Sequence, residues 1–192
     1  YSEVKASNLV KIDIDGNKLD DSPHPVNRAG FVQHSVFHRH VPDAHCIIHT
    51  HTTAGMAVSS TQEGLLATNF YAGFLVGNIA YHDFEGVTVR PEEGARLVAN
   101  LGDKRFMILR NHGLLGMGQT LPEAFLRYFV FERACQIQLA TRQAGTPLII
   151  PDDVLAVHKR DMFSAIPAER FGLLDFSAMV RVIDRVDPSW RD

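Results

Sequence analysis

The segment from Cys46 to His51 constrains the chain most, because an apolar run leads directly into two histidines that are separated by one residue. Cys46-Ile47-Ile48 predicts a short buried strand. Side chains at positions i and i+2 of a strand point to the same face. His49 and His51 are therefore expected to leave the strand on one side, where both imidazoles could bind a single metal ion.

A third histidine stands in a matching context further along the chain. The continuous apolar run from Phe106 to Leu109 predicts a strand that is buried on both faces, and His112 follows it closely. A catalytic zinc ion has three protein ligands and one open position. His49, His51 and His112 together therefore form the candidate metal site. The context matters, because the chain holds 10 histidines and one His-x-His pair alone is weak evidence.

A rival histidine pair lies in a predicted helix from Ala29 to His40, which ends before Pro42. His34 and His38 are four residues apart and so share one helix face. No glutamate directly follows His34, so the zinc-protease signature is absent. Either His34 faces the metal site, or both histidines are polar residues of a partly buried helix.

Composition limits the class of protein. The chain has 192 residues, of which 45% are hydrophobic and 21% charged, as is typical of one globular domain. The net charge of −3 gives no reason to expect nucleic acid or a membrane as a partner. Cys46 and Cys135 lie in apolar contexts and are expected to be reduced thiols, which favours a cytoplasmic protein. The chain begins at Tyr1 rather than Met, so we expect an N-terminal part to be missing.

The remaining patterns predict intermingled strands and helices. That mixture favours a layered α/β domain with a mixed, mainly antiparallel sheet. No glycine-rich phosphate loop and no Gly-x-Ser-x-Gly motif is present. The expected strands are one at Leu9–Ile14, which begins a hairpin around Asp15-Gly16, one at Val76–Tyr81 and one at Leu114–Gly118. The expected helices are a short one after Thr52, one from Pro91 to Leu101, a long one from a capping box at Thr120–Glu123 to Gly145, and a last one at Phe176–Val186. A loop is expected from Pro147.

From Gly30 to Gly145 the chain resembles the class II aldolase/adducin family, and it is most similar to the adducin-like bacterial branch. An ordered set of motifs carries this resemblance. They are Phe31-Val32-Gln33-His34-Ser35, Pro42-Asp43-Ala44-His45-Cys46-Ile47-Ile48-His49-Thr50-His51, Ala54-Gly55-Met56-Ala57-Val58-Ser59, Ala80-Tyr81-His82-Asp83, Ile108-Leu109-Arg110-Asn111-His112-Gly113-Leu114, Glu123-Ala124-Phe125 and Ala134-Cys135-Gln136-Ile137-Gln138.

The resemblance implies a three-layer α/β/α sandwich on a mixed, mainly antiparallel sheet, formed by residues 1–192 as a single domain that lacks its N-terminal part. It also implies that His49, His51 and His112 bind a divalent metal. Zinc is the expected ion, with manganese, iron or cobalt as alternatives. Many members of the family are homotetramers, and we expect one here because the helix from Thr120 is apolar nearly all round at first.

One departure from the family pattern bears on the chemistry. In the sugar-phosphate aldolases of the family, a glutamate stands four residues before the position of His34, and two serines precede it. This chain has Gly30 there, with Arg28-Ala29 in place of the serines. The proton-shuttling acid and the phosphate-holding hydroxyls are thus absent. Proton transfer would then fall to His34, Tyr71 or a metal-bound hydroxide.

The sequence therefore predicts a metal-dependent carbon–carbon lyase. It would act by aldol cleavage or decarboxylation through a metal-stabilised enolate, on a small oxygenated acid or carbonyl compound. The alternative is a non-catalytic adducin-like assembly module that keeps the fold. A metal-dependent hydrolase is a weaker possibility, because no carboxylate base stands beside the histidines in the sequence.

Overall fold

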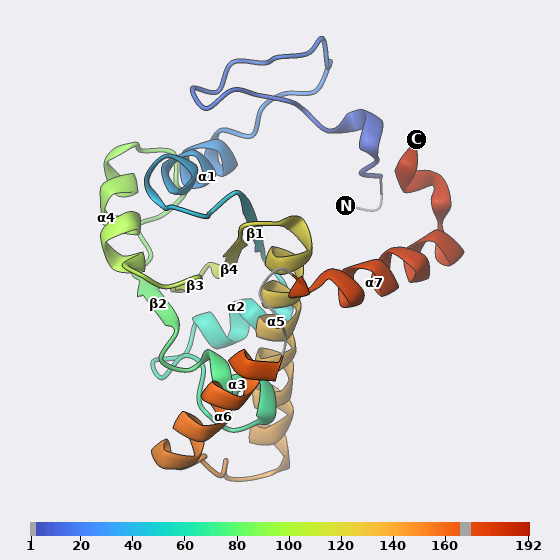
Figure 1. The fold of residues 1–192 in the computed structure, drawn as a ribbon. Coiled ribbons are helices and arrows are strands. Elements are labelled where there is room, and N and C mark those ends of the chain that lie inside the picture. Colours follow the sequence, from blue (N-terminus) through green and yellow to red (C-terminus); the bar gives the residue numbers. More distant parts are fainter. Residues whose placement is uncertain (1–2, 166–169) are drawn as a thin grey trace.

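A four-stranded sheet with the order β1-β4-β3-β2 is the centre of the molecule (Figure 1). The computed structural model describes residues 3–165 and 170–192. β4 pairs antiparallel with both β1 and β3, whereas β2 and β3 are parallel, so the predicted mixed and mainly antiparallel sheet is confirmed. The strands are β1 (Cys46–Thr50), β2 (Ile79–His82), β3 (Phe106–Leu109) and β4 (Gly113–Gly118).

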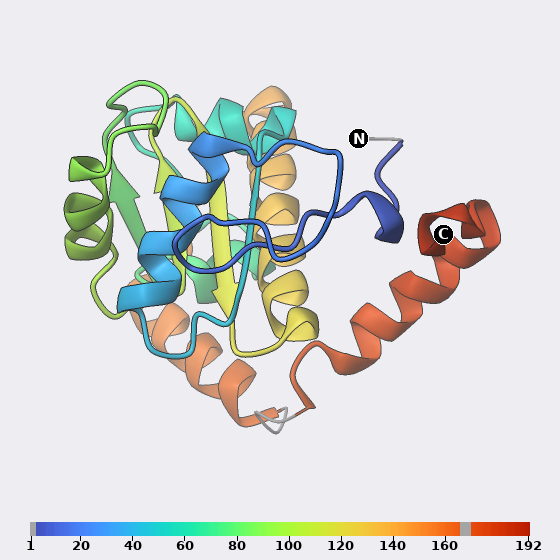
Figure 2. The same ribbon diagram turned by 90° about the horizontal axis from the view of Figure 1, so that it is seen from above.

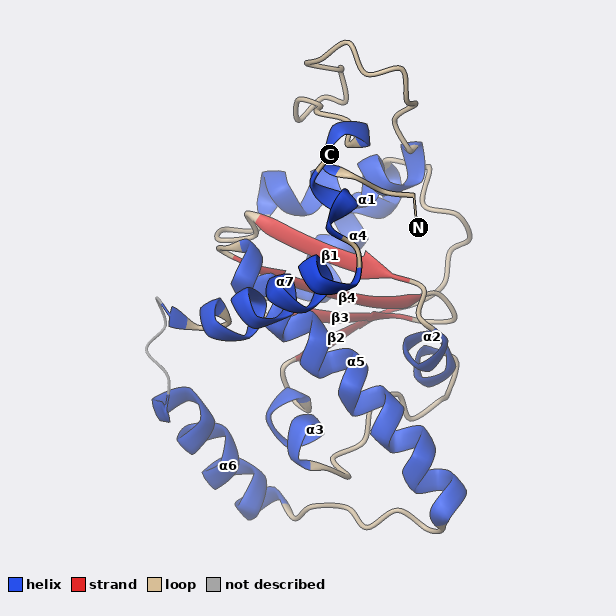
Figure 3. Cartoon of the chain, turned by 90° about the vertical axis from the view of Figure 1, so that its right-hand side faces the viewer, coloured by secondary structure: helices blue, strands red, loops and turns tan. Residues whose placement is uncertain are grey.

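One face of the sheet is covered by α1 (Arg28–His40) and α4 (Glu92–Leu101), which lie on the same side of the strands in Figure 3. Phe37 of α1 and Leu97 of α4 are fully buried there, in one apolar cluster with Met107 of β3. Asn27 caps α1, since its side-chain oxygen accepts hydrogen bonds from two backbone N–H groups of the first turn.

The other face is covered by α2 (Thr53–Ser59), α3 (Phe70–Leu75) and α5 (Leu121–Ala144). Phe131 of α5 and Ile108 of β3 belong to the apolar cluster on this side. Ile108 and its strand neighbour Met107 thus face opposite layers, as expected for a strand that is buried on both faces. The result is the predicted three-layer α/β/α arrangement.

The described residues of the C-terminal part form two α-helices and a short 3-10 helix, Pro188–Arg191. The prediction of loop from Pro147 onward is wrong, because α6 (Asp152–Ala165) follows and packs on α3. Its apolar pattern is weak: Leu155 is buried, whereas Val154 and Val157 are about half exposed. The expected last helix is present as α7 (Leu173–Val186), which reaches away from the sheet (Figures 1 and 2). No helix in the described ranges is long and apolar enough to cross a membrane.

The N-terminal segment, residues 3–26, runs across α1 as an extended loop with one short 3-10 helix, Ala6–Asn8 (Figure 2). The predicted hairpin strand is not formed; a single bridge pairs Ile12 with Lys18 around the Asp15-Gly16 turn. This segment finds no partner in the four-stranded sheet. It is instead tied to α1 by Arg39, whose guanidinium donates to the carbonyl of Ile14 and to the carboxylate of Asp15.

Candidate metal centre

His49, His51 and His112 come together at one edge of the sheet, where β1 and β3 end and β4 begins. Their ligand nitrogens all lie within 4.8 Å of one another. The Nε2 atoms of His49 and His51 are 3.1 Å apart, close to the ~3.3 Å separation of two nitrogens on a tetrahedral zinc. The three predicted ligands therefore converge. His49 and His51 do so because residues two apart on a strand point to the same face.

The imidazole of His49 is oriented by the backbone. Its Nδ1 lies 2.9 Å from the carbonyl oxygen of Leu114, which can only accept, so Nδ1 carries the proton and donates. The neutral ring then presents the lone pair of Nε2 toward the other two histidines. Burial lowers the pKa of His49 to about 4, and burial likewise lowers the pKa of His112. Both rings are thus neutral and able to bind a metal near pH 7.

The turn before β4 brings His112 close to β1. Asn111 has a φ of 55°, a left-handed conformation that asparagine tolerates better than most residues. A Cβ atom on Gly113 would lie 2.6 Å from the carbonyl oxygen of Thr50, so only glycine allows this close approach of β4 to β1. Glycine directly after His112 is therefore part of how the site is built.

The donor set fits a divalent metal. Three imidazole nitrogens that lie close together match one of the ligand sets of catalytic zinc sites, which leaves one position for a small molecule. Among the described residues, no carboxylate or thiol belongs to this group. Iron, cobalt and manganese also accept imidazole ligands, so the donor set alone does not select zinc.

A cleft of about 420 Å³ opens in front of the three histidines. Helix α1 forms one wall and the loop between β2 and α4 forms another. The ring of Phe84 in this loop stands 6.3 Å from that of His112. The residues that line the cleft are Asn27, Ala29, Gly30, Gln33, His34, His49, Thr50, His51, Phe84, Gly86, Val87, Thr88 and His112.

Gln33 is a polar residue of the cleft for which the sequence pattern predicted no role. Its side chain is 3% exposed, and its amide nitrogen has no hydrogen-bond partner. A buried amide without a partner is costly, and a substrate oxygen in the cleft would satisfy it. Its position three residues after Gly30, on the same helix face, was the signal that could have identified it.

His34 lines the cleft, as predicted for one of the two helix histidines. Burial lowers the pKa of His34 to about 4, and the neighbouring His49 and His38 contribute less. His38 does not join the site: it is exposed, and its Nδ1 donates to the carbonyl oxygen of Ala44 at 2.7 Å. The rival pair therefore does not form a metal site with the three histidines.

Tyr71, the other predicted proton-transfer residue, lies elsewhere in this chain. It belongs to α3, on the opposite face of the sheet from α1, and packs against the apolar cluster there. It is not among the described residues that line the cleft. Its ring stands 5.8 Å from that of Phe70. Within one chain, Tyr71 therefore has a packing role, and a role in proton transfer would require a second copy.

The loop that forms the second wall is held by a buried network. His82, at the end of β2, accepts at Nδ1 from the amide of Asn100, so its proton is on Nε2. That nitrogen faces a carboxylate oxygen of Glu93 at 3.4 Å. The hydroxyl of Thr88, in the loop, donates to the same oxygen at 3.2 Å. Glu93 thereby connects the strand end, α4 and the wall of the cleft.

The fold and the site together define a class of protein: a mixed sheet between helical layers, with three histidines that could hold a divalent metal at one edge, beside a small cleft. The family model described as "Class II Aldolase and Adducin N-terminal domain" matches residues 1–139. The chain belongs to the class II aldolase and adducin family.

Individual relatives support this assignment. The chain is 41% identical, over 195 residues, to a putative class 2 aldolase of Pseudomonas aeruginosa; the match covers 100% of this chain and 75% of that protein. It is 38% identical to rat alpha-adducin, with 97% of this chain and 27% of the adducin covered. An L-fuculose 1-phosphate aldolase from Glaciozyma antarctica has a similar structure, with a TM-score of 0.81 and 26% identity over 98% of this chain and 73% of that one.

Proposed function

We propose that the protein is a metal-dependent carbon–carbon lyase that acts on a small oxygenated acid or carbonyl compound. The convergence of His49, His51 and His112 at the floor of a cleft carries the proposal. A bound divalent ion, most simply zinc, would act as a Lewis acid that stabilises negative charge on the substrate. The cleft, at about 420 Å³, has the size of a small-molecule site.

The chain's own residues would then bind and orient the substrate. The buried amide of Gln33 is free to donate to a substrate oxygen. His34, neutral near pH 7, is the group on α1 that could accept or return a proton. No carboxylate is among the described residues that line the cleft. Decarboxylation fits this lining well, because loss of carbon dioxide generates the carbanion without a first proton abstraction.

The alternative function is a non-catalytic assembly module. The 38% identity to alpha-adducin and the absence of an acid at Gly30 favour it. The unpartnered amide of Gln33 in the cleft favours the lyase, because an assembly module has no need of a buried donor beside three histidines. The two functions differ in whether a small molecule is turned over.

We also propose a homotetramer in the cytoplasm. Helix α7 exposes a series of apolar side chains, and α5 adds two more. These residues and their exposed fractions are Leu173 46%, Leu174 68%, Met179 41%, Val182 40%, Ile183 43%, Val186 74%, Leu121 49% and Phe129 42%. Apolar surface of this extent is typical of an interface between subunits. Light scattering at micromolar concentration tests this, and a monomer would contradict it.

The test of the lyase combines metal analysis with turnover. Elemental analysis of the purified chain should find one divalent ion per chain, and His112→Ala should lose it. His24→Ala, in an exposed loop, is the matched control and should keep the ion. Release of carbon dioxide or an aldehyde is then assayed over a panel of keto acids and aldols. A stoichiometric metal without any turnover would support the assembly module, and an ion retained by His112→Ala would contradict the proposed site.

A further inference from the structure

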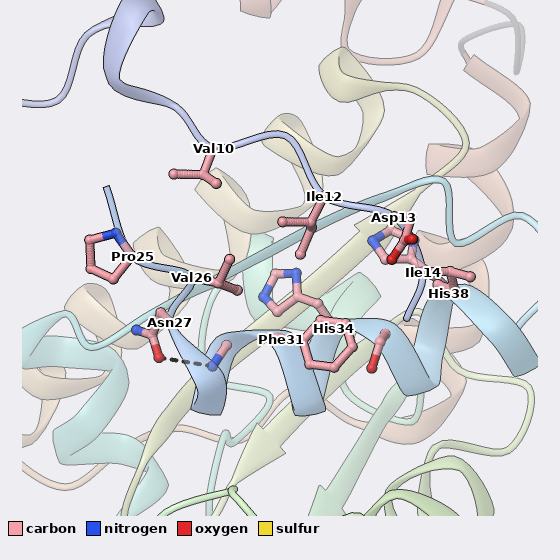
Figure 4. A pocket seen from close by; sticks show the side chains of 12 residues that line it. Val10, Ile12, Asp13, Ile14, Pro25, Val26, Asn27, Phe31, His34 and His38 are labelled. Carbon is pink, nitrogen blue, oxygen red and sulfur yellow. Dashed lines mark hydrogen bonds between the residues drawn. The ribbon is translucent and has the colours of Figure 1, made fainter. Parts of the chain in front are cut away.

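A second cavity, of about 460 Å³, lies between the N-terminal segment and α1 (Figure 4). Val10 and Ile12 come from the segment, and Phe31 and His34 come from the helix below it. The full lining is Val10, Ile12, Asp13, Ile14, Pro25, Val26, Asn27, Gly30, Phe31, His34, Ser35 and His38. A cavity of ~150 Å³ is enough to hold one benzene ring, so this space can take a sizeable group.

The polar groups at the far side of this cavity already have partners within the protein. The carboxylate of Asp13 accepts hydrogen bonds from the backbone of Asp15 and from both the backbone and the side chain of Asn17. The ring of His38 donates to a backbone carbonyl. What is left to contact a ligand is mainly the apolar surface of Val10, Ile12 and their neighbours. The cavity is therefore suited to an apolar group rather than to a charged one.

This cavity adjoins the cleft in front of the three histidines. Asn27, Gly30 and His34 line both spaces. Gly30 contributes no side chain at the junction, and a Cβ atom there would meet only the side chain of Asn27, at 3.7 Å or more. A ligand with its polar end at the histidines could therefore pass Gly30 and continue under the N-terminal segment.

We propose that the substrate carries an apolar tail, aromatic or branched aliphatic, which binds in the cavity between the N-terminal segment and α1 while its oxygenated head lies at the three histidines. Gly30 is the residue that opens this path, and Ile12 and Val26 contact the tail. This inference rests on the proposed metal site. It adds the class of substrate: an acid or carbonyl compound with a bulky hydrocarbon group, rather than a sugar phosphate.

Binding of two hydroxamates to the zinc-loaded full chain tests the proposal. Acetohydroxamate carries only the metal-binding head, and 3-phenylpropanohydroxamate adds an aromatic tail to the same head. Titration calorimetry should find the second at least about tenfold tighter, as expected when a phenyl group leaves water. Equal affinity of the two compounds would overturn the tail site and leave the metal site standing.

Substitutions then locate the tail. Ile12→Asp places a charge in the cavity without touching the cleft, so it should abolish the tenfold advantage and leave acetohydroxamate binding unchanged. Leu9→Asp is the matched control, because Leu9 is 62% exposed on the same segment and lines neither space. An advantage that survives Ile12→Asp would place the tail elsewhere and overturn the proposal.

A larger side chain at Gly30, between the cleft and the cavity, gives an independent test. Gly30→Leu should also remove the advantage of the longer compound, whereas Gly30→Ala should reduce it little, since a single Cβ makes only ordinary contacts there. If zinc-loaded and zinc-free protein bind acetohydroxamate equally, the proposed metal site is contradicted, and so is the tail site that rests on it. That outcome is distinguishable from failure of the tail site alone, in which acetohydroxamate binding still depends on zinc.

Discussion

Two sets of histidines lie at the same edge of the sheet, and they differ in what surrounds their ring nitrogens. His49, His51 and His112 face one another across the ends of β1 and β4, with no carboxylate in their group among the described residues. His82, at the end of β2, is buried between the amide of Asn100 and the carboxylate of Glu93. The first set leaves nitrogen lone pairs available, and the second has none to offer.

The difference shows that neighbouring groups, rather than burial, decide what a histidine can do. His82 is 3% exposed, and it connects β2, α4 and the loop over the cleft. His49 is only partly buried, but its Nδ1 is bonded to a backbone carbonyl and its Nε2 is directed at the other ligands. We therefore expect substitutions in the first set to change metal binding, and substitutions around His82 to change stability.

The largest expected effect is on metal affinity. His112→Ala should weaken zinc binding by on the order of 1000-fold, because each ligand of a structural zinc contributes several kcal/mol of binding free energy. The free energy of unfolding of the metal-free protein should change little, since His112 lies at the site and outside both apolar clusters. Competition with a chelating dye measures the affinity. Equal affinity of variant and parent would remove the distinction between the two histidine sets.

The converse substitution removes the carboxylate beside His82. Glu93→Ala should lower the free energy of unfolding of the metal-free protein by about 3 kcal/mol, because it leaves the buried hydroxyl of Thr88 without its acceptor and removes the carboxylate that faces Nε2 of His82 at 3.4 Å. Urea denaturation measures the loss. Glu92→Ala, at the exposed neighbouring position on α4, is the control and should cost far less. A loss no larger than that of the control would mean that the network does not hold the loop.

Acid should act on His49 of the first set and on its neighbour His34 in the metal-free protein. A histidine whose pKa is lower in the folded state favours the folded state above pH 6.5 and loses this contribution as the pH falls toward its folded pKa. For His34 that window runs from 6.5 to about 4, and for His49 likewise. His34→Gln should remove on the order of 2 kcal/mol of the stability lost between pH 7 and pH 4. Urea midpoints measured across this range test it, with the exposed His24→Gln as control.

The smallest effect concerns the missing acid. Gly30→Glu should raise cleavage of fuculose 1-phosphate at least about tenfold from a low starting level, since a positioned acid or base typically contributes more than this. The helix should tolerate the change, because a Cβ atom there makes only ordinary contacts with Asn27 and an acid in the first turn of α1 is favourable. Gly30→Gln has the same size without the charge and should not raise the rate. Cleavage by the parent at ordinary enzyme rates would contradict the importance given to Gly30.

Local rules were enough to predict that the three histidines come together. The spacing of His49 and His51 on a strand places them on one face, and a buried strand just before His112 carries that residue to the same edge. Helical spacing from Gly30 could have placed Gln33 on the face toward the cleft, but it could not show that the amide is buried without a partner, because that depends on the tertiary packing around it. Tyr71 was ambiguous for a related reason: an aromatic pair in the sequence does not say which face of the sheet its helix will cover. The strand expected at Leu9–Ile14 fails because alternation alone does not provide a neighbouring strand with which to pair.

The room for a Cβ atom at Gly30 also has an evolutionary consequence. Some glycine codons become glutamate codons by a single base change, and a Cβ atom at this position makes only ordinary contacts with Asn27. Ancestors of such a chain could therefore have gained or lost the acid without passing through an unfolded intermediate. A change at this single position would then alter the chemistry at the histidines while the fold is kept.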